Sequence, residues 1–172
     1  AGLPDWELFR INAFSFSERF GFDPSLTIDV FVYGVKLGVF ELSWNLVCPG
    51  CGGVEYSWAR LEQISRERVH CTICDIQVDT EIDNHIEASF SLSPSVRKLA
   101  IDPLSSFETF RRYYFSATHE RSPELMEYSK QHFLGFSIVP PHEKREFTWT
   151  SKEGDLYRLL SAPTHSQTSV VV

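Results

Sequence analysis

The sequence contains two tight cysteine pairs, Cys48-Pro-Gly-Cys51 and Cys71-Thr-Ile-Cys74, and these are its only four cysteines. Nineteen residues separate the pairs, so the pattern is C-x2-C-x19-C-x2-C, a spacing typical of a four-thiolate zinc site. Two residues between thiols allow one turn to direct both sulfur atoms at a single cation. We therefore predict that Cys48, Cys51, Cys71 and Cys74 bind one Zn²⁺ in a zinc ribbon.

Other readings of the four cysteines remain open. Two structural disulfides would require an oxidising compartment, which no signal peptide indicates. Iron is a second alternative, because ligand types alone do not distinguish iron from zinc. His70 could compete as a ligand, but four thiolates already fill the coordination sphere. A closed sphere leaves no open position for a reaction, so we interpret the metal as structural.

Composition indicates a folded chain without a membrane span. Hydrophobic residues make up 42% of the 172 residues and aromatic residues 14%, which is enough for a core. No apolar run approaches the ~18 residues of a transmembrane helix. Reduced cysteines then suggest a cytoplasmic location. The chain begins at Ala1 and its last residues read as a strand, so we expect it to be part of a longer polypeptide.

The negative charge is concentrated around the cysteines. Residues 1–84 hold 6 Lys and Arg against 13 Asp and Glu, whereas residues 85–172 hold 10 against 10. Nucleic-acid binding depends on basic side chains that neutralise phosphates. A zinc ribbon in an acidic half is poorly suited to that role, so DNA and RNA are disfavoured as partners.

The first half of the chain predicts mainly helices. Asp5 is expected to cap a short amphipathic helix that extends through Ile11. A second helical stretch runs from Ser15 to Phe20 and ends at Gly21. Asp23 and Pro24 then begin a longer helix, closed by Gly38, whose apolar residues at helical spacing are expected to face the core. These residues are Leu26, Val30, Tyr33 and Leu37.

Around the cysteines we predict a strand, a helix and a connector. Residues 40–47 alternate apolar and polar side chains, which is typical of a half-buried strand. Ser57 is expected to cap a short helix between the cysteine pairs. The acidic connector after Cys74 contains Asp75, Asp79, Glu81 and Asp83, and we interpret it as solvated.

The second half reads mainly as strands. Residues 86–92 alternate like a strand, and residues 104–115 form an inserted helix with an aromatic face. Four further strands are predicted at residues 133–139, 145–150, 156–161 and 167–172. The fold class is therefore α+β: a small helical region plus a four-cysteine zinc ribbon, followed by an antiparallel β-sandwich-like module. The predicted domains are residues 1–84 and 85–172.

Motifs of catalysis are absent from the sequence. It contains no phosphate-binding glycine loop, no G-x-S-x-G elbow and no H-E-x-x-H helix. The histidines are scattered singly, and adjacent pairs such as His142-Glu143 and His165-Ser166 seldom face each other in a strand. We predict that the isolated chain is not an enzyme.

Several segments resemble a known family. Trp44-Asn-Leu-Val-Cys-Pro-Gly-Cys-Gly52, preceded by Gly38-Val-Phe40, is similar to the N-terminal zinc-ribbon domain of certain bacterial adenylate/guanylate cyclases. Further similar stretches are Trp6-Glu-Leu-Phe-Arg-Ile-Asn12, Phe90-Ser-Leu-Ser-Pro-Ser-Val-Arg97 and Thr164-His-Ser166. The cyclase's paired metal-binding aspartates have no counterpart here.

The resemblance implies a regulatory domain that precedes a class III cyclase catalytic domain. Only the zinc ligands carry over: Cys48, Cys51, Cys71 and Cys74. Candidate partners are the cyclase catalytic domain in cis, another protein, a small-molecule ligand or a second copy in a homodimer. The alternatives are a stand-alone zinc-ribbon module that binds nucleic acid or protein, and a small-molecule-sensing β-module whose aromatic helix lines a pocket.

Overall fold

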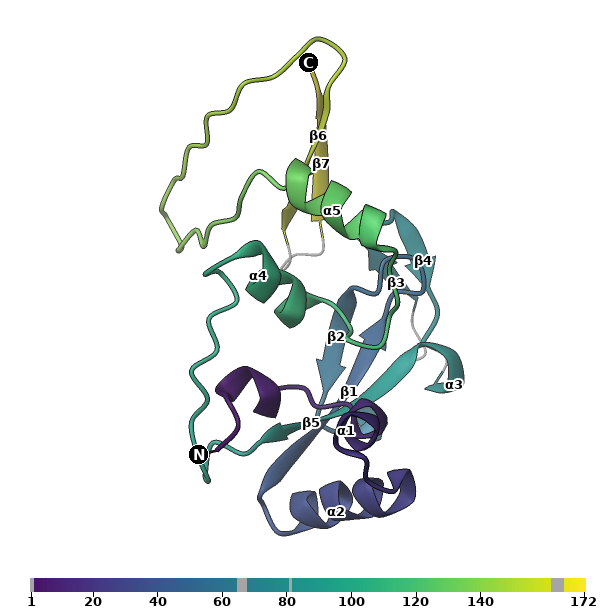
Figure 1. Ribbon diagram of the computed structural model, residues 1–172. Coiled ribbons are helices and arrows are strands. Elements are labelled where there is room, and N and C mark those ends of the chain that lie inside the picture. Colours follow the sequence, from purple (N-terminus) through teal and green to yellow (C-terminus); the bar gives the residue numbers. More distant parts are fainter. Residues whose placement is uncertain (1, 65–67, 81, 162–165) are drawn as a thin grey trace.

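The chain folds into short helices and small antiparallel sheets, which confirms the predicted α+β class (Figure 1). The computed structural model describes residues 2–64, 68–80, 82–161 and 166–172. The largest sheet has the strand order β2-β1-β5 and is antiparallel throughout. Its strands are β1 (Phe40–Val47), β2 (Val54–Trp58) and β5 (Ile86–Leu92). Predicted strands 40–47 and 86–92 are thus confirmed and lie side by side.

The helix after Asp23 begins where the sequence predicts, whereas the helix before it begins two residues earlier than the predicted Ser15. α1 (Ala13–Phe20) is capped by Asn12 and ends at Gly21. α2 (Pro24–Lys36) follows Asp23, whose carboxylate accepts a hydrogen bond from the Leu26 amide at 2.8 Å. The carboxylate satisfies one of the free amides of the first turn, and Pro24 occupies a position that needs no amide donor.

The predicted helix from Asp5 to Ile11 is shorter than expected. Only the 3-10 helix η1 (Asp5–Leu8) forms, and Asp5 is its first residue rather than its cap, which is Pro4. Arg10 then has a positive φ of 50° that turns the chain. Ile11 then exchanges backbone hydrogen bonds with Phe90, at 2.7 and 2.9 Å. Pairing with the sheet therefore replaces the last helical turn.

The prediction that Leu26, Val30, Tyr33 and Leu37 face the core is wrong. These side chains, which we call the α2 stripe, are between 58% and 77% exposed. The opposite side of α2 faces the core instead, through Thr27, Phe31 and Gly34. Both sides of α2 are apolar, so helical spacing alone could not distinguish the buried side from the exposed one.

The core of the N-terminal region forms around Phe31. Its ring lies 5.0 Å from Phe90, 4.9 Å from Phe40 and 5.3 Å from Phe16, measured between centroids. Gly34 makes the contact with β1 feasible, because a Cβ atom there would lie 2.5 Å from Phe40 Cδ2. These contacts attach α1 and α2 to the sheet.

A polar contact crosses the centre of this sheet. Asn45 is fully buried, and its amide nitrogen donates to Ser89 Oγ at 2.7 Å. Its amide oxygen accepts from Ser57 Oγ at 2.6 Å. The prediction that Ser57 caps a helix is therefore wrong: Ser57 lies in β2 and pairs with Asn45 of β1. A short helical turn, η2 (Leu61–Gln63), follows β2.

The second pair of cysteines lies in a small hairpin of its own. β3 (Val69–Cys71) and β4 (Ile76–Val78) pair antiparallel, and α3 (Ile82–His85) precedes β5. In the acidic connector, Asp79 accepts a hydrogen bond from Arg68 Nε at 2.8 Å. Glu81 lies outside the described residues.

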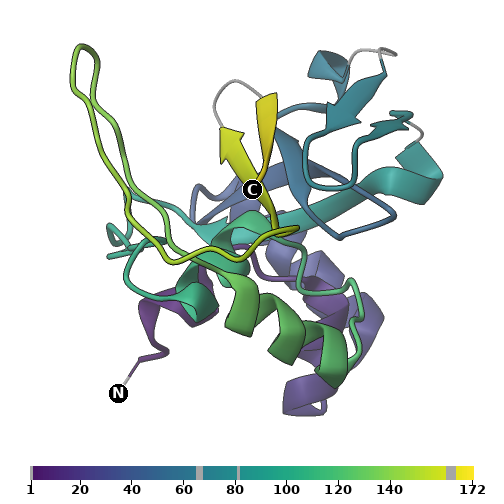
Figure 2. The same cartoon turned by 90° about the horizontal axis from the view of Figure 1, so that it is seen from above.

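Two of the four late strands do not form. Residues 133–139 and 145–150 have no strand partner, whereas β6 (Leu156–Ser161) and β7 (Ser166–Val171) form a hairpin. Leu134 and Ile138 are exposed, and Pro140 and Pro141 have no amide to donate. A strand needs a neighbouring strand to pair its backbone N–H and C=O groups. The alternation of apolar and polar residues does not show whether such a neighbour is present. Figure 2 shows this segment extending away from the sheet as a long loop.

Two helices lie in the described part of residues 86–172, where one was predicted. α4 (Phe107–Tyr114) falls within the predicted helix 104–115, and α5 (Pro123–His132), capped by Ser122, was not predicted. The proposed domain boundary after residue 84 stays a prediction. However, β5 lies beyond it and pairs along its length with β1, so backbone hydrogen bonds join the two segments.

Candidate metal centre

The first cysteine turn connects β1 to β2. The Cys48 amide donates to the Gly53 carbonyl at 2.8 Å, and the Gly52 amide donates to the Cys48 carbonyl at 2.8 Å. Gly52 has a φ of 71°, a left-handed conformation that glycine adopts without steric cost. This closed turn brings Cys48 and Cys51 to the same side of the chain.

The second cysteine turn repeats this geometry between β3 and β4. The Asp75 amide donates to the Cys71 carbonyl at 2.9 Å, and Asp75 has a φ of 59°. In both turns, therefore, the residue after the second cysteine is left-handed and donates to the carbonyl of the first cysteine. His70 does not compete as a ligand in this arrangement, because its Nε2 lies 2.8 Å from Asp75 Oδ1.

The two turns place all four sulfur atoms together. The Sγ atoms of Cys48, Cys51, Cys71 and Cys74 lie within 4.8 Å of one another, and those of Cys51 and Cys71 are 3.6 Å apart. A tetrahedral cation with Zn–S bonds near 2.3 Å would separate its ligands by about 3.8 Å. All four cysteines are free thiols rather than disulfides. The cluster is therefore compatible with one metal ion.

The surroundings of the sulfur atoms suit a thiolate-bound cation. Cys48 and Cys71 are fully buried, and they pack with Leu46 and Val78 in a second core cluster. The Gly53 amide donates to Cys51 Sγ at 3.3 Å, and the Cys74 amide donates to Cys71 Sγ at 3.5 Å. Such amide donors stabilise negative charge on sulfur.

Without a metal, the thiols of Cys71 and Cys74 hold their protons. The Cys51 thiol and burial raise the pKa of Cys71, and burial raises the pKa of Cys74 to about 11. A cation must displace these protons, so metal binding at this cluster depends on pH.

A downstream segment, residues 115–121, covers the first cysteine turn. Phe115 pairs with Gly53 through a β-bridge, and the Ser116 amide donates to the Gly52 carbonyl at 2.8 Å. His119 packs so closely on Gly52 that an added Cβ would lie 2.6 Å from the ring. No local sequence pattern predicts this contact, because it joins segments that are far apart along the chain.

Arg121 brings a positive charge to the cluster. Its guanidinium lies 4.3 Å from the centroid of the Phe115 ring, and its buried Nη2 has no hydrogen-bond partner among the described residues. Burial lowers the pKa of Arg121, while the thiol groups of Cys51 and Cys74 act in the opposite direction. Arg121 is therefore positioned to balance the net −2 charge that four thiolates and one divalent cation would carry.

The C-terminal hairpin reaches the second cysteine turn. Arg158 of β6 donates through Nη1 to the carbonyl oxygen of Ile73 at 2.8 Å. Both cysteine turns are thus held by residues far along the chain. Of the Thr164-His-Ser166 stretch, only Ser166 lies within the described residues.

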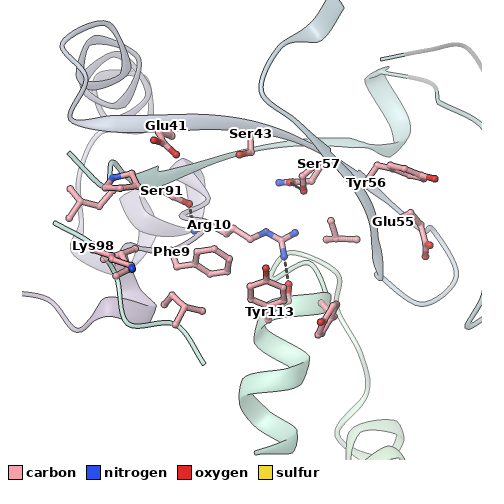
Figure 3. A pocket seen from close by; sticks show the side chains of 17 residues that line it. Phe9, Arg10, Glu41, Ser43, Glu55, Tyr56, Ser57, Ser91, Lys98 and Tyr113 are labelled. Carbon is pink, nitrogen blue, oxygen red and sulfur yellow. Dashed lines mark hydrogen bonds between the residues drawn. The ribbon is translucent and has the colours of Figure 1, made fainter. Parts of the chain in front are cut away.

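A cavity lies against the face of β1 that carries Glu41, Ser43 and Asn45. It has a volume of about 500 Å³ and is bounded by β1, β2, the N-terminal segment and α4. Figure 3 shows Arg10 extended along it, with its guanidinium beside Tyr113. Arg10 donates to the Tyr113 carbonyl, and burial lowers its pKa. The lining includes serine hydroxyls, aromatic rings and both signs of charge: Ser43, Ser57, Tyr56, Tyr114, Glu41 and Lys98.

Fold and site together define an α+β domain with a clustered set of four cysteines. Residues 1–153 match DUF5939, a family of unknown function, and the chain belongs to that family. No curated protein and no solved structure matches the chain. No helix in the described parts of the chain combines the length and apolar character needed to cross a membrane.

Proposed function

We propose that this chain is a non-catalytic regulatory or interaction domain held together by a structural Zn²⁺. The observation that carries the proposal is the cluster of four sulfur atoms within 4.8 Å of one another. Four thiolates would complete a tetrahedral sphere and leave no position for substrate or water. The metal would then stabilise the fold and take no part in a reaction.

The contacts around the cluster support a role in domain arrangement. Residues 115–121 lie on the first cysteine turn, and Arg158 of the C-terminal hairpin contacts the second. A metal that fixes both turns would also fix the segments attached to them. Loss of the metal would therefore loosen both cysteine turns. It would also loosen the segment after α4, which is attached to the first turn.

The resemblance to bacterial adenylate/guanylate cyclases supports a place ahead of a class III catalytic domain in the cytoplasm. Catalysis there depends on the pairing of two catalytic domains, so a regulatory domain needs only to bias that pairing. Purified chain should form no cyclic AMP from ATP. Measurable turnover by the isolated chain would refute the non-catalytic assignment.

A metal-site variant tests the regulatory role. In a polypeptide that joins this chain to a cyclase domain, Cys48→Ser with Cys71→Ser should change cyclase activity. The matched control is Ser137→Ala, on the exposed loop after α5. Equal activity in all three proteins, with zinc lost only from the cysteine variant, would contradict a regulatory role for the metal site.

The cavity beside Arg10 supports a second candidate function, recognition of a small polar molecule. Its volume of about 500 Å³ lies within the range of ligand pockets, and its lining mixes aromatic rings with hydroxyls and charges. A fragment panel screened by thermal shift tests this function. Hits should be lost in Ser43→Trp, which fills the cavity, and retained in Ser151→Trp, at an exposed position. A panel without hits, or hits retained in Ser43→Trp, would refute it.

A further inference from the structure

The outward side of α2 is a large apolar surface with few charges. The α2 stripe (Leu26, Val30, Tyr33 and Leu37) is exposed along the whole helix. Asp29 and Lys36 are the only charged residues of α2, and both are exposed. With about 100° of rotation per residue, the two lie together along one flank of the stripe. Contiguous exposed apolar surfaces of this kind mark interaction sites.

The spacing of the residues in the stripe is the same in both directions. Steps of four, three and four residues separate Leu26, Val30, Tyr33 and Leu37. An antiparallel copy of the helix therefore places Leu26 opposite Leu37 and Val30 opposite Tyr33. This alternation of three and four is also the spacing with which paired helices interlock their side chains.

The charges on the flank are complementary in the same arrangement. A two-fold axis perpendicular to both helices brings Asp29 of each copy close to Lys36 of the other copy. A parallel arrangement would instead direct these two residues at the side of Thr27 and Gly34, which packs on the core of its own chain and offers no charge. The self-complementary pattern favours a second copy over a lipid surface or an unrelated partner, neither of which requires paired opposite charges.

We propose that α2 is a self-association surface at which two copies of this chain pair through antiparallel α2 helices. The interface is isologous, with the same residues contributed by each copy. A helix of 13 residues is only about 20 Å long, so the buried area falls at the low end for specific association. The pair is therefore a concentration-dependent dimer. This inference does not depend on the proposed regulatory function.

Sedimentation of the full chain over a range of concentrations tests the dimer. Wild-type protein should shift from monomer to dimer, and Tyr33→Glu should weaken the association by roughly tenfold or more. Tyr128→Glu on α5 is the matched control, because Tyr128 is 60% exposed and Tyr33 is 64% exposed. The control should dimerise like wild type.

Charge exchange tests the antiparallel geometry. Asp29→Lys alone and Lys36→Asp alone should each be monomeric, because like charges then face each other. The double variant should regain the dimer, and so should an equimolar mixture of the two single variants. A parallel pair would not respond in this way.

Three outcomes would overturn the inference. One is a wild-type chain that stays monomeric up to about 100 µM, where even a weak specific dimer is populated. Another is a dimer that persists unchanged in Tyr33→Glu. The third is a monomeric wild type that binds anionic vesicles and loses that binding in Leu26→Ser with Leu37→Ser, which would assign the surface to lipid.

Discussion

The amide of Ser116 donates a hydrogen bond to the carbonyl oxygen of Gly52 at 2.8 Å. This contact joins the segment after α4 to the turn that carries Cys48 and Cys51. Figure 1 shows the consequence: α5 and the C-terminal hairpin lie on the same side of the molecule as the small β3–β4 hairpin. The cysteine cluster thus lies where the early and late parts of the chain meet.

Gly52 should be more sensitive to substitution than Gly154, another glycine with a positive φ. Gly52→Ala combines a φ of 71° with a Cβ 2.6 Å from His119, whereas Gly154→Ala has a φ of 87° and no atom within 4 Å. Gly154→Ala should lower the free energy of unfolding by about 1–2 kcal/mol through backbone strain alone. Gly52→Ala should cost roughly 1–3 kcal/mol more, because His119 must move. Urea unfolding measures both, and equal losses would mean that residues 115–121 do not cover the turn.

Arg121→Met should weaken metal retention while preserving the fold. The substitution keeps an apolar stem of similar length against Phe115 but removes the positive charge near Cys51. Transfer of the metal to a chromogenic chelator should become roughly tenfold faster, in line with losses seen for residues that surround a metal's ligands. Arg145→Met, remote from the cluster, should transfer at the wild-type rate. If Arg121→Met also transfers its metal at the wild-type rate, the Arg121 guanidinium does not balance the charge of the cluster.

The ionised Glu7 side chain should stabilise the folded state at neutral pH, and this contribution to the free energy of unfolding should be lost in acid. Burial opposes its ionisation, but hydrogen bonds from Arg112, at 3.1 Å, and from Arg19 outweigh burial and lower the pKa of Glu7. A lowered pKa in the folded state stabilises the fold above the unfolded pKa, near 4.3, and this gain disappears as pH falls through the folded pKa.

The Glu7→Gln variant tests this pH dependence. At pH 7 it should be less stable than wild type by about 1 kcal/mol, because the ion pairs are partly exposed. The difference should shrink below pH 4.3 and vanish in stronger acid. A difference for Glu7→Gln that stays constant from pH 7 to strong acid would contradict the ion-pair explanation.

The two hydrogen bonds of Asn45 should differ in their contribution. Ser89 is buried, so Ser89→Ala leaves the Asn45 amide nitrogen without a partner in a dry environment, at a cost of roughly 1–3 kcal/mol. Ser57 is exposed, and water can replace its hydroxyl, so Ser57→Ala should cost less. Thermal unfolding compares the two variants. A larger loss for Ser57→Ala would contradict the assigned burial.

Local chemistry in the sequence predicted much of this fold. The cysteine spacing predicted the cluster, and Asp23 with Pro24 predicted the start of α2, since ligand spacing and helix capping depend on neighbours in the chain. Long-range features could not be predicted in this way. The exposed side of α2, the pairing of Ser57 with Asn45 and the position of Arg121 near Cys51 all depend on contacts between distant segments. In residues 133–150 the local pattern predicted strands that do not form, because no neighbouring strand that the structure describes pairs with them.

Elemental analysis of the purified chain, after dialysis against metal-free buffer, tests the central claim most directly. A structural four-thiolate site predicts one zinc per chain in the wild type and none in Cys48→Ser with Cys71→Ser. A chain with far less than one equivalent of any metal, and with all four thiols free to react, would contradict it.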